Sequence, residues 1–131
     1  MTQLNRIPTA ILMALAFAGF CNGQEDPTPT EKLSKENTSI KDVMKAAHKK
    51  PNELLKSVAL GKAKKPEIER LLKLYKIMSQ HTPPKGDADG WKKKTKLLVE
   101  ATESVIAGKP DATKLLAKAS NCKSCHSAHK K

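Results

Sequence analysis

The chain ends in the stretch NCKSCHSAHKK, residues 121–131. Within this stretch, Cys122, Cys125 and His126 have the Cys-x-x-Cys-His spacing that is the attachment signature of a c-type haem. Residues three and four apart share one face of a helix, so both thiols and the imidazole point the same way. The thiols can then bond the two vinyl groups of one porphyrin while the imidazole reaches the iron. We therefore expect one covalently bound haem c.

Three other uses of the two cysteines fit the sequence less well. A structural zinc site would have to draw four ligands from residues 122–129 and arrange them as a tetrahedron. A thioredoxin-like dithiol belongs at a helix N-terminus in a βαβ setting, and the chain shows no strand pattern. A disulfide between Cys122 and Cys125 would close a very short loop and stabilise little. The sequence therefore favours haem.

The start of the chain has the features of a secretory signal. Arg6 supplies a positive end and residues 11–20 form an apolar run that is too short to span a bilayer. Lipidation at Cys21 is an alternative, although Phe20 is large for that processing site. We predict removal of residues 1–23, export to the periplasm and no transmembrane segment. The mature chain would keep only the two cysteines of the motif.

The chain is strongly basic, with 25 Lys and Arg residues against 13 Asp and Glu residues and a net charge of +12. Such a balance suits acidic proteins, anionic surfaces or nucleic acid. An exported protein with few aromatic residues for base stacking is a poor candidate for nucleic-acid binding. We therefore expect an acidic redox partner protein and no nucleic acid, with residues 92–94 beside Trp91 as the expected contact. The other lysines are expected to form a solvated surface that keeps the protein soluble.

Capping and breaking residues divide the rest of the chain into helices. Ser39, with Asp42 three residues later, forms a capping-box pattern that starts the first helix. Pro51 marks either a kink or a new start, so residues 39–60 are one broken helix or two short ones. Their apolar stripe consists of Ile40, Val43, Met44, Ala47, Leu54, Leu55 and Val58.

Three further helices are predicted. Pro66 lies in the first turn of the second helix, and residues 81–90 form a loop with two Pro and two Gly. Asp89 is expected to cap the third helix and Asp111 the fourth. The buried stripe of the second helix is Ile68, Leu71, Leu72, Tyr75 and Met78, and that of the third is Trp91, Thr95, Leu98, Thr102 and Val105. In the fourth helix, which runs to the end of the chain, spacings of four, three and four residues put these side chains on one face: Leu115, Ala119, Cys122 and His126.

These elements define the expected architecture. Residues 24–38 read as a flexible leader rich in Pro, Thr, Glu and Lys, and residues 39–131 as one domain. Short connections favour antiparallel neighbours. We expect an all-α protein, an antiparallel four-helix bundle with haem attached to the C-terminal helix. The mature chain has only two aromatic residues, Tyr75 and Trp91, so haem would supply the large apolar body that its core lacks.

The ending CKSCHSAHKK, residues 122–131, resembles that of the class II c-type cytochromes, which comprise cytochrome c′ and its methionine-ligated low-spin relatives. Over residues 39–131 the resemblance lies in the order of the helices along the chain. Only the haem motif is specific to c-type cytochromes. The family often has an aromatic residue and then Arg where this chain has His129 and Lys130. Its low-spin members place a methionine ligand early in the first helix, and Met44 matches that place. Family members are often dimers, which makes a homodimer possible here.

The sixth iron ligand and the function follow from these expectations. Met44 is expected opposite His126, while His48 is expected near solvent at a helix end and is the alternative ligand. Of the remaining candidates, Met78 is expected in the core, His81 exposed in a loop and His129 at the haem edge. The predicted function is an exported monohaem one-electron carrier that is not an enzyme. The alternative is a gas-binding protein, for NO or CO, with an open sixth site; a small peroxidase ranks last.

Overall fold

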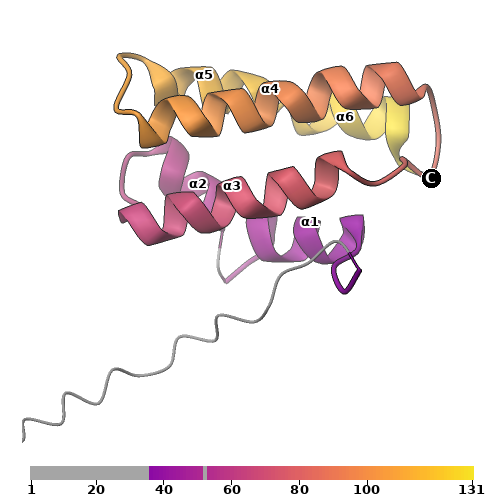
Figure 1. The fold of residues 1–131 in the computed structure, drawn as a ribbon, viewed down its shortest axis with the longest axis horizontal. Helices are drawn as coiled ribbons and strands as arrows, with labels where there is room; N and C mark the ends of the chain where they lie inside the picture. The colour runs from indigo at the N-terminus through magenta and orange to yellow at the C-terminus, as the bar shows by residue number, and fades with distance from the viewer. Residues whose placement is uncertain (1–35, 52) are drawn as a thin grey trace, which may run out of the picture.

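The computed structural model describes residues 36–51 and 53–131, and this part of the chain folds into six helices without strands (Figure 1). The predicted signal 1–23, Cys21 and nearly all of the predicted leader lie outside the described residues. The helices are α1 Ile40–His48, α2 Leu54–Ala59, α3 Lys65–Ser79, α4 Ala88–Ile106, α5 Ala112–Ala119 and α6 Cys122–His129. No helix in this part is long and apolar enough to cross a membrane. The predicted all-α class is confirmed.

The starts of α1 and α3 follow the predicted signals. The Ser39 hydroxyl accepts a hydrogen bond from the Asp42 amide at 3.2 Å, and the Asp42 carboxylate accepts one from the Ser39 amide at 3.2 Å. This is the capping box, and it satisfies two amides that a helix start leaves unpaired. Pro66 lies in the first turn of α3, where the Glu67 carboxylate accepts from the Lys64 amide at 2.7 Å. Residues 39–60 form two short helices, one of the two predicted possibilities.

Two of the predicted caps differ in the structure. The carboxylate of Asp87, not that of Asp89, caps α4 by accepting from the amides of Gly90 at 2.6 Å and Asp89 at 3.3 Å. The prediction of Asp89 as the cap was therefore wrong, because the helix begins earlier and Asp89 lies in its first turn. Asp111 precedes α5 with a left-handed φ of 58°, and its side chain caps no amide. It pairs instead with Lys114, at 2.7 Å.

The predicted fourth helix is two helices. α5 ends at Ala119 and α6 begins at Cys122, with Ser120 and Asn121 between them. The Asn121 side chain accepts a hydrogen bond from the Ser124 amide at 3.0 Å and so caps α6. An Asn side chain competes with the helix for backbone hydrogen bonds, which explains why the helix restarts here. The Cys-x-x-Cys-His residues therefore occupy a short helix of their own.

The helices pack around α3 and α4, which lie side by side and are joined at one end by residues 80–87 (Figure 1). α1 and α2 pack against each other and against α3, and α2 also packs against α5. α5 packs along α4. Among the described helices, α6 packs against α4 alone and makes no close backbone approach to α1.

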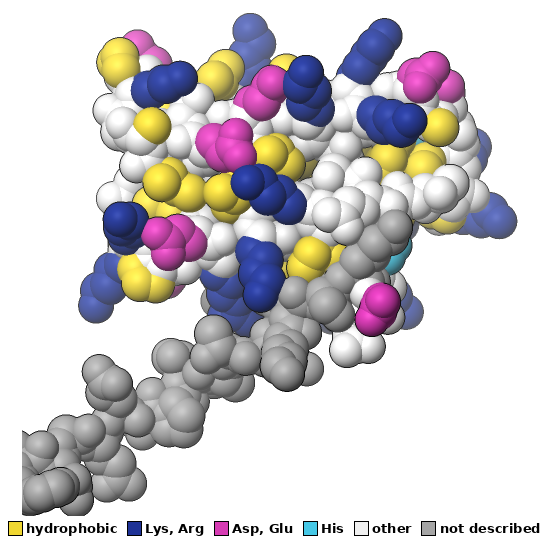
Figure 2. All heavy atoms as spheres, in the orientation of Figure 1, with side chains coloured by type: hydrophobic (Ala, Val, Ile, Leu, Met, Phe, Trp, Pro, Cys, Tyr) yellow, Lys and Arg dark blue, Asp and Glu magenta, His cyan; other side chains and the backbone are white. Residues whose placement is uncertain are grey.

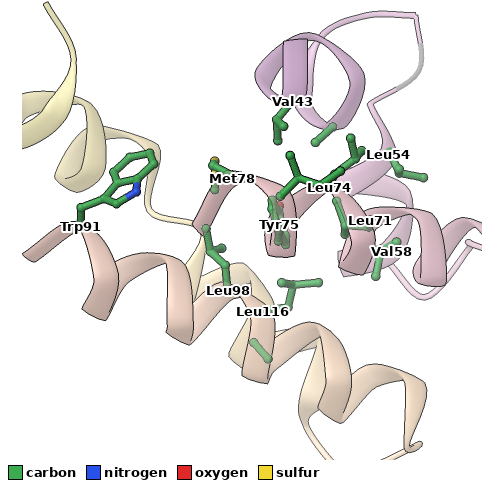
Figure 3. Close-up of a cluster of buried hydrophobic side chains, with 13 residues drawn as sticks. Val43, Leu54, Val58, Leu71, Leu74, Tyr75, Met78, Trp91, Leu98 and Leu116 are labelled. Atoms are coloured by element: carbon green, nitrogen blue, oxygen red, sulfur yellow. The ribbon is translucent and has the colours of Figure 1, made fainter. Parts of the chain in front are cut away.

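The core lies where α1, α2, α3, α4 and α5 meet (Figure 3). Within it, the hydroxyls of Thr95 and Thr102 are buried and donate to carbonyls one turn earlier in α4, at 2.9 and 2.7 Å. Leu115 of α5 is 52% exposed, whereas its neighbour Leu116 is fully buried. The largest side chains with no exposure are Val43, Leu71, Leu74, Tyr75, Met78 and Leu116.

The boundary of the domain lies slightly before the predicted one. Thr38, which was assigned to the flexible leader, is buried, and its carbonyl lies 2.8 Å from Nε2 of His81. His81 is consequently half-buried, so the prediction that it is exposed in its loop was wrong. This hydrogen bond ties the residue before α1 to the residues that follow α3.

Candidate haem site

Two adjoining cavities lie between α1 and α6. The first has a volume of about 690 Å³ and is lined by residues of α1, α3, α4, α5 and α6. The second, of about 500 Å³, is lined by residues of α1, α4, α6 and the residues beside them. Both volumes are in the range of about 300–1,000 Å³ that is usual for ligand and cofactor sites. The residues common to both are Met44, Lys49, Cys125 and His126.

All three residues of the motif lie on the α6 wall of the first cavity. Cys122, Cys125 and His126 all line the first cavity, and neither cysteine forms a disulfide. Cys122 is exposed, whereas Cys125 is half-buried, and burial raises the pKa of the Cys125 thiol. Leu115 and Ala119 of α5 line the same cavity. The face predicted for one continuous helix therefore exists across the break at Asn121, but it borders the cavity instead of the packed core.

The opposite wall is α1. Met44 is half-buried, lines both cavities and packs against the hydrophobic core. His48, one helical turn later, lines the first cavity. Its ring is half-buried, and its Nε2 is shielded from water without a hydrogen-bond partner in the described part of the chain. Burial, and to a lesser degree the charge of His126, lowers the pKa of His48. The expectation that His48 lies near solvent was therefore wrong.

One residue of α3, Met78, lines the first cavity, and Tyr75 lies near it beside His48. Met78 is fully buried, as predicted for a core residue, and also lines the cavity. The ring of Tyr75 lies beside that of His48, with the centroids 6.0 Å apart and the planes inclined by 38°. The Tyr75 hydroxyl is buried without a partner, and burial raises its pKa. Two unpartnered polar groups therefore lie next to each other near this cavity.

The second cavity is bordered by Trp91 and His129, whose rings meet edge to face at 5.5 Å. His129 is only 4% exposed, and its Nδ1 lies 3.3 Å from the Lys85 carbonyl. The indole nitrogen of Trp91 is buried without a partner in the described residues. In residues 36–51 and 53–131, no three His, Cys, Asp or Glu side chains gather as a metal cluster. The four ligands of the zinc alternative are not gathered, because His129 packs against Trp91.

The loop before α4 holds this end of α6 in place. Gly86 has a φ of +84°, in the left-handed region that favours glycine. A Cβ atom at Gly86 would overlap the Ala128 carbonyl and lie 3.0 Å from Nδ1 of His129. The backbone of the loop and the last turn of α6 therefore approach more closely than any other residue would permit.

Lysines border both cavities. Lys49, Lys94 and Lys118 line the first cavity, and Lys41, Lys45, Lys49 and Lys130 line the second. No Asp or Glu is among the described residues that line either cavity. The Lys94 ammonium donates to the Ser124 hydroxyl at 2.7 Å and so links α4 to α6. Figure 2 shows Lys and Arg side chains spread over the face in view rather than gathered on one element.

No protein-family model matches the chain, and comparisons with curated proteins and with solved structures give no match. The assignment of the site therefore depends on its own residues and geometry.

These residues fit a c-type haem. Two free thiols and an imidazole occupy one wall, and the cavity that they border separates α6 from α1, which makes no close backbone approach to it. The lining also carries aliphatic side chains suited to a porphyrin face: Met44, Met78, Leu97, Leu98, Leu115 and Ala119. Lysines border the same space and suit the carboxylates of haem propionates.

Proposed function

We propose that the protein is an exported monohaem c-type cytochrome that carries one electron at a time, and is not an enzyme. One observation carries the proposal. The complete Cys-x-x-Cys-His set lines a cavity whose opposite wall offers two further iron donors, Met44 and His48. When bound, haem supplies the chemistry, an iron that alternates between the ferrous and ferric states.

Each residue of the cavity has a role in this proposal. Cys122 and Cys125 would hold the porphyrin covalently, and His126 would bind the iron. Met44 or His48 of α1 would supply a second protein ligand. The aliphatic lining excludes water from the site and lowers the local dielectric constant, which sets the reduction potential together with the axial ligands.

The proposed function goes with an antiparallel four-helix bundle like that of the class II c-type cytochromes. In this proposal α1 and α2 form the first arm, α3 and α4 the second and third, and α5 with α6 the fourth. The packing of α3 between α1 and α4, and of α5 on α4, supports this arrangement. A homodimer, also usual in that family, stays a prediction.

The proposal is tested on the protein purified from cells that attach haem to exported proteins. We expect the intact mass to exceed that of the cleaved polypeptide by one haem, and the haem to survive denaturing electrophoresis. The optical spectrum should change reversibly on reduction and reoxidation. Extraction of the haem by acid acetone, or zinc in its place, would contradict the proposal. A high-spin ferric spectrum that changes on adding NO or CO would favour the gas-binding alternative.

We further propose that the lysines bordering the cavities dock an acidic redox partner. Lys92 and Lys93, the expected contact, are exposed but line neither cavity, whereas Lys94 lines the first. Opposite charges on two proteins speed their association, and salt screens this attraction beyond a Debye length of about 8 Å at physiological ionic strength. The second-order rate of electron transfer with an acidic protein should therefore fall steeply with added salt.

A matched pair of variants locates this docking surface. Lys118→Glu changes a lysine of the cavity border, whereas Lys62→Glu changes an exposed lysine that lines neither cavity. The rate should fall more for Lys118→Glu at low salt, and the two variants should converge at high salt. Equal rates for both variants at low salt would mean that the lysines only solvate the surface.

A further inference from the structure

We infer that His48 is the sixth ligand of the haem iron, opposite His126, and that Met44 packs beside it. This inference rests on the proposed function, because it names the ligand that completes the same site. The resemblance to the class II cytochromes favours Met44, so the structure and the resemblance point to different residues.

The four histidines of the chain fall into two pairs. A ring nitrogen of His81 lies 2.8 Å from the Thr38 carbonyl, and one of His129 lies 3.3 Å from the Lys85 carbonyl. Those backbone partners hold both rings in place. His48 and His126 have no such partner in the described part of the chain, and both line the first cavity. They belong to different helices, α1 and α6, which face each other across it.

Packing accounts for the position of Met44 but not for that of His48. A thioether needs no hydrogen bond, and Met44 lies against the hydrophobic core as an apolar side chain would. A neutral imidazole, in contrast, carries one N–H donor and one lone pair, and buried polar atoms are nearly always paired. Nε2 of His48 is shielded from water and unpaired. A bond from this ring to iron would give its lone pair a partner.

The arrangement of the cavity is consistent with this ligand. His48 is the last residue of α1, so its ring stands at the end of the helix and beside the cavity that Cys122, Cys125 and His126 line. Imidazole is a good iron ligand in its neutral form. A porphyrin bonded to both thiols would occupy the space between the two imidazoles.

One rival explanation uses Tyr75. Its hydroxyl is also buried and unpaired, and its ring lies 6.0 Å from that of His48. A hydrogen bond between the two side chains would satisfy both without any iron. In that case His48 would serve the core, and the Tyr75→Phe and His48→Ala variants would behave alike.

The experiment compares the holoprotein with four variants, His48→Ala, His48→Met, Met44→Leu and Tyr75→Phe. Haem retained after denaturing electrophoresis and helicity by circular dichroism are measured first in each. We expect the wild-type protein to show the electron paramagnetic resonance signature of two imidazole ligands and to lack a sulfur-to-iron charge-transfer band. His48→Ala should lose the six-coordinate low-spin spectrum, while Met44→Leu and Tyr75→Phe keep it. His48→Met should raise the reduction potential, because a thioether favours ferrous iron.

The outcomes that would overturn the inference are distinct from those that would overturn the proposed function. A wild-type protein without covalent haem contradicts the function itself. Covalent haem with a sulfur-to-iron band that Met44→Leu removes would make Met44 the ligand. The low-spin spectrum could also stay unchanged in both His48→Ala and Tyr75→Phe, with equal losses of thermal stability. That result would favour a hydrogen bond between His48 and Tyr75 over a bond from His48 to iron. If His48→Ala does not fold, the wild-type resonance spectrum alone decides between two imidazoles and one.

Discussion

The two ends of the molecule are built in different ways. Where α3, α4 and α5 meet, Leu74, Thr102 and Leu116 have no exposed surface, and every polar group among them is hydrogen-bonded. Between α1 and α6, two cavities separate the helices. Three of the four buried polar atoms without partners belong to residues that line these cavities: His48, Trp91 and His129. The core of the first end is thus closely packed, whereas the second end keeps open space beside buried polar atoms that lack partners.

The largest expected effect comes from removing the thiols at the cavity end. Cys122→Ser and Cys125→Ser should each weaken or abolish covalent retention of haem, because each removes one of the two bonds to the porphyrin. Haem staining after denaturing electrophoresis and the intact mass measure the loss. Ser127→Ala is the matched control, since Ser127 lies in the same helix and lines neither cavity. Full retention of covalent haem in the double cysteine variant would refute the attachment.

Neighbouring leucines of α5 provide the next comparison. Leu116→Ala should lower the free energy of unfolding by about 2–5 kcal/mol, because it leaves a void among fully buried side chains. Leu115→Ala should cost less than about 1 kcal/mol, because Leu115 is half exposed and borders the first cavity. Denaturant titration of both variants measures the difference. Equal losses would mean that the cavity end is packed as tightly as the core.

A comparison of two glycines with positive φ distinguishes the cost of backbone strain from the cost of a steric overlap. Gly86→Ala and Gly61→Ala each place a side chain in the left-handed region, at a cost of about 1–2 kcal/mol. Only Gly86→Ala adds an overlap with the Ala128 carbonyl, because nothing lies near the corresponding position at Gly61. The free energy of unfolding should therefore fall further for Gly86→Ala, with a changed haem spectrum. Equal losses for the two would show that the loop does not hold α6.

The smallest expected effect concerns the start of α1. Ser39→Ala removes the side-chain half of the capping box and should lower the free energy of unfolding by about 1 kcal/mol. Ser39→Asp keeps an acceptor for the Asp42 amide and should recover much of this loss. Thermal unfolding of the two variants tests the cap. A Ser39→Ala variant as stable as the wild-type protein would mean that core packing alone fixes α1.

Local signals allowed several helix starts to be predicted. The capping box at Ser39 and Pro66 in a first turn each have a short-range physical cause, and both are present in the structure. The stripe predicted for α3 is partly right, because Leu71, Tyr75 and Met78 are buried. Its other two members are half-buried, and Leu74 and Ile77, which are buried, were missed. The break before α6 also had a local signal that sequence reasoning missed. Asn121, three residues before Ser124, is a favourable N-cap at that place.

The cavity end was less predictable because it depends on contacts between distant residues. His48 precedes two lysines and Pro51, which indicates an exposed helix end. Its burial follows from the packing of α1 against α3 and from the ring of Tyr75, neither of which its neighbours in sequence reveal. Leu115 and Leu116 are both apolar, so only the rotation of α5 decides which of them enters the core. The Cys-x-x-Cys-His spacing, in contrast, could be read directly from the sequence, because it lies within five consecutive residues.

The separate packing of α6 has a consequence for local unfolding. Among the described helices, α6 packs only against α4, and Asn121 interrupts its continuity with α5. Apart from the loop at Lys85 and Gly86, this helix therefore has few contacts to break before it detaches. Native-state hydrogen exchange reports such partial opening as a free energy below that of global unfolding. Amides of α6 should therefore exchange through a low-energy opening, while amides of α3 exchange only when the whole protein unfolds. Attachment of a rigid group between α6 and α1 would join the two into one cooperative unit.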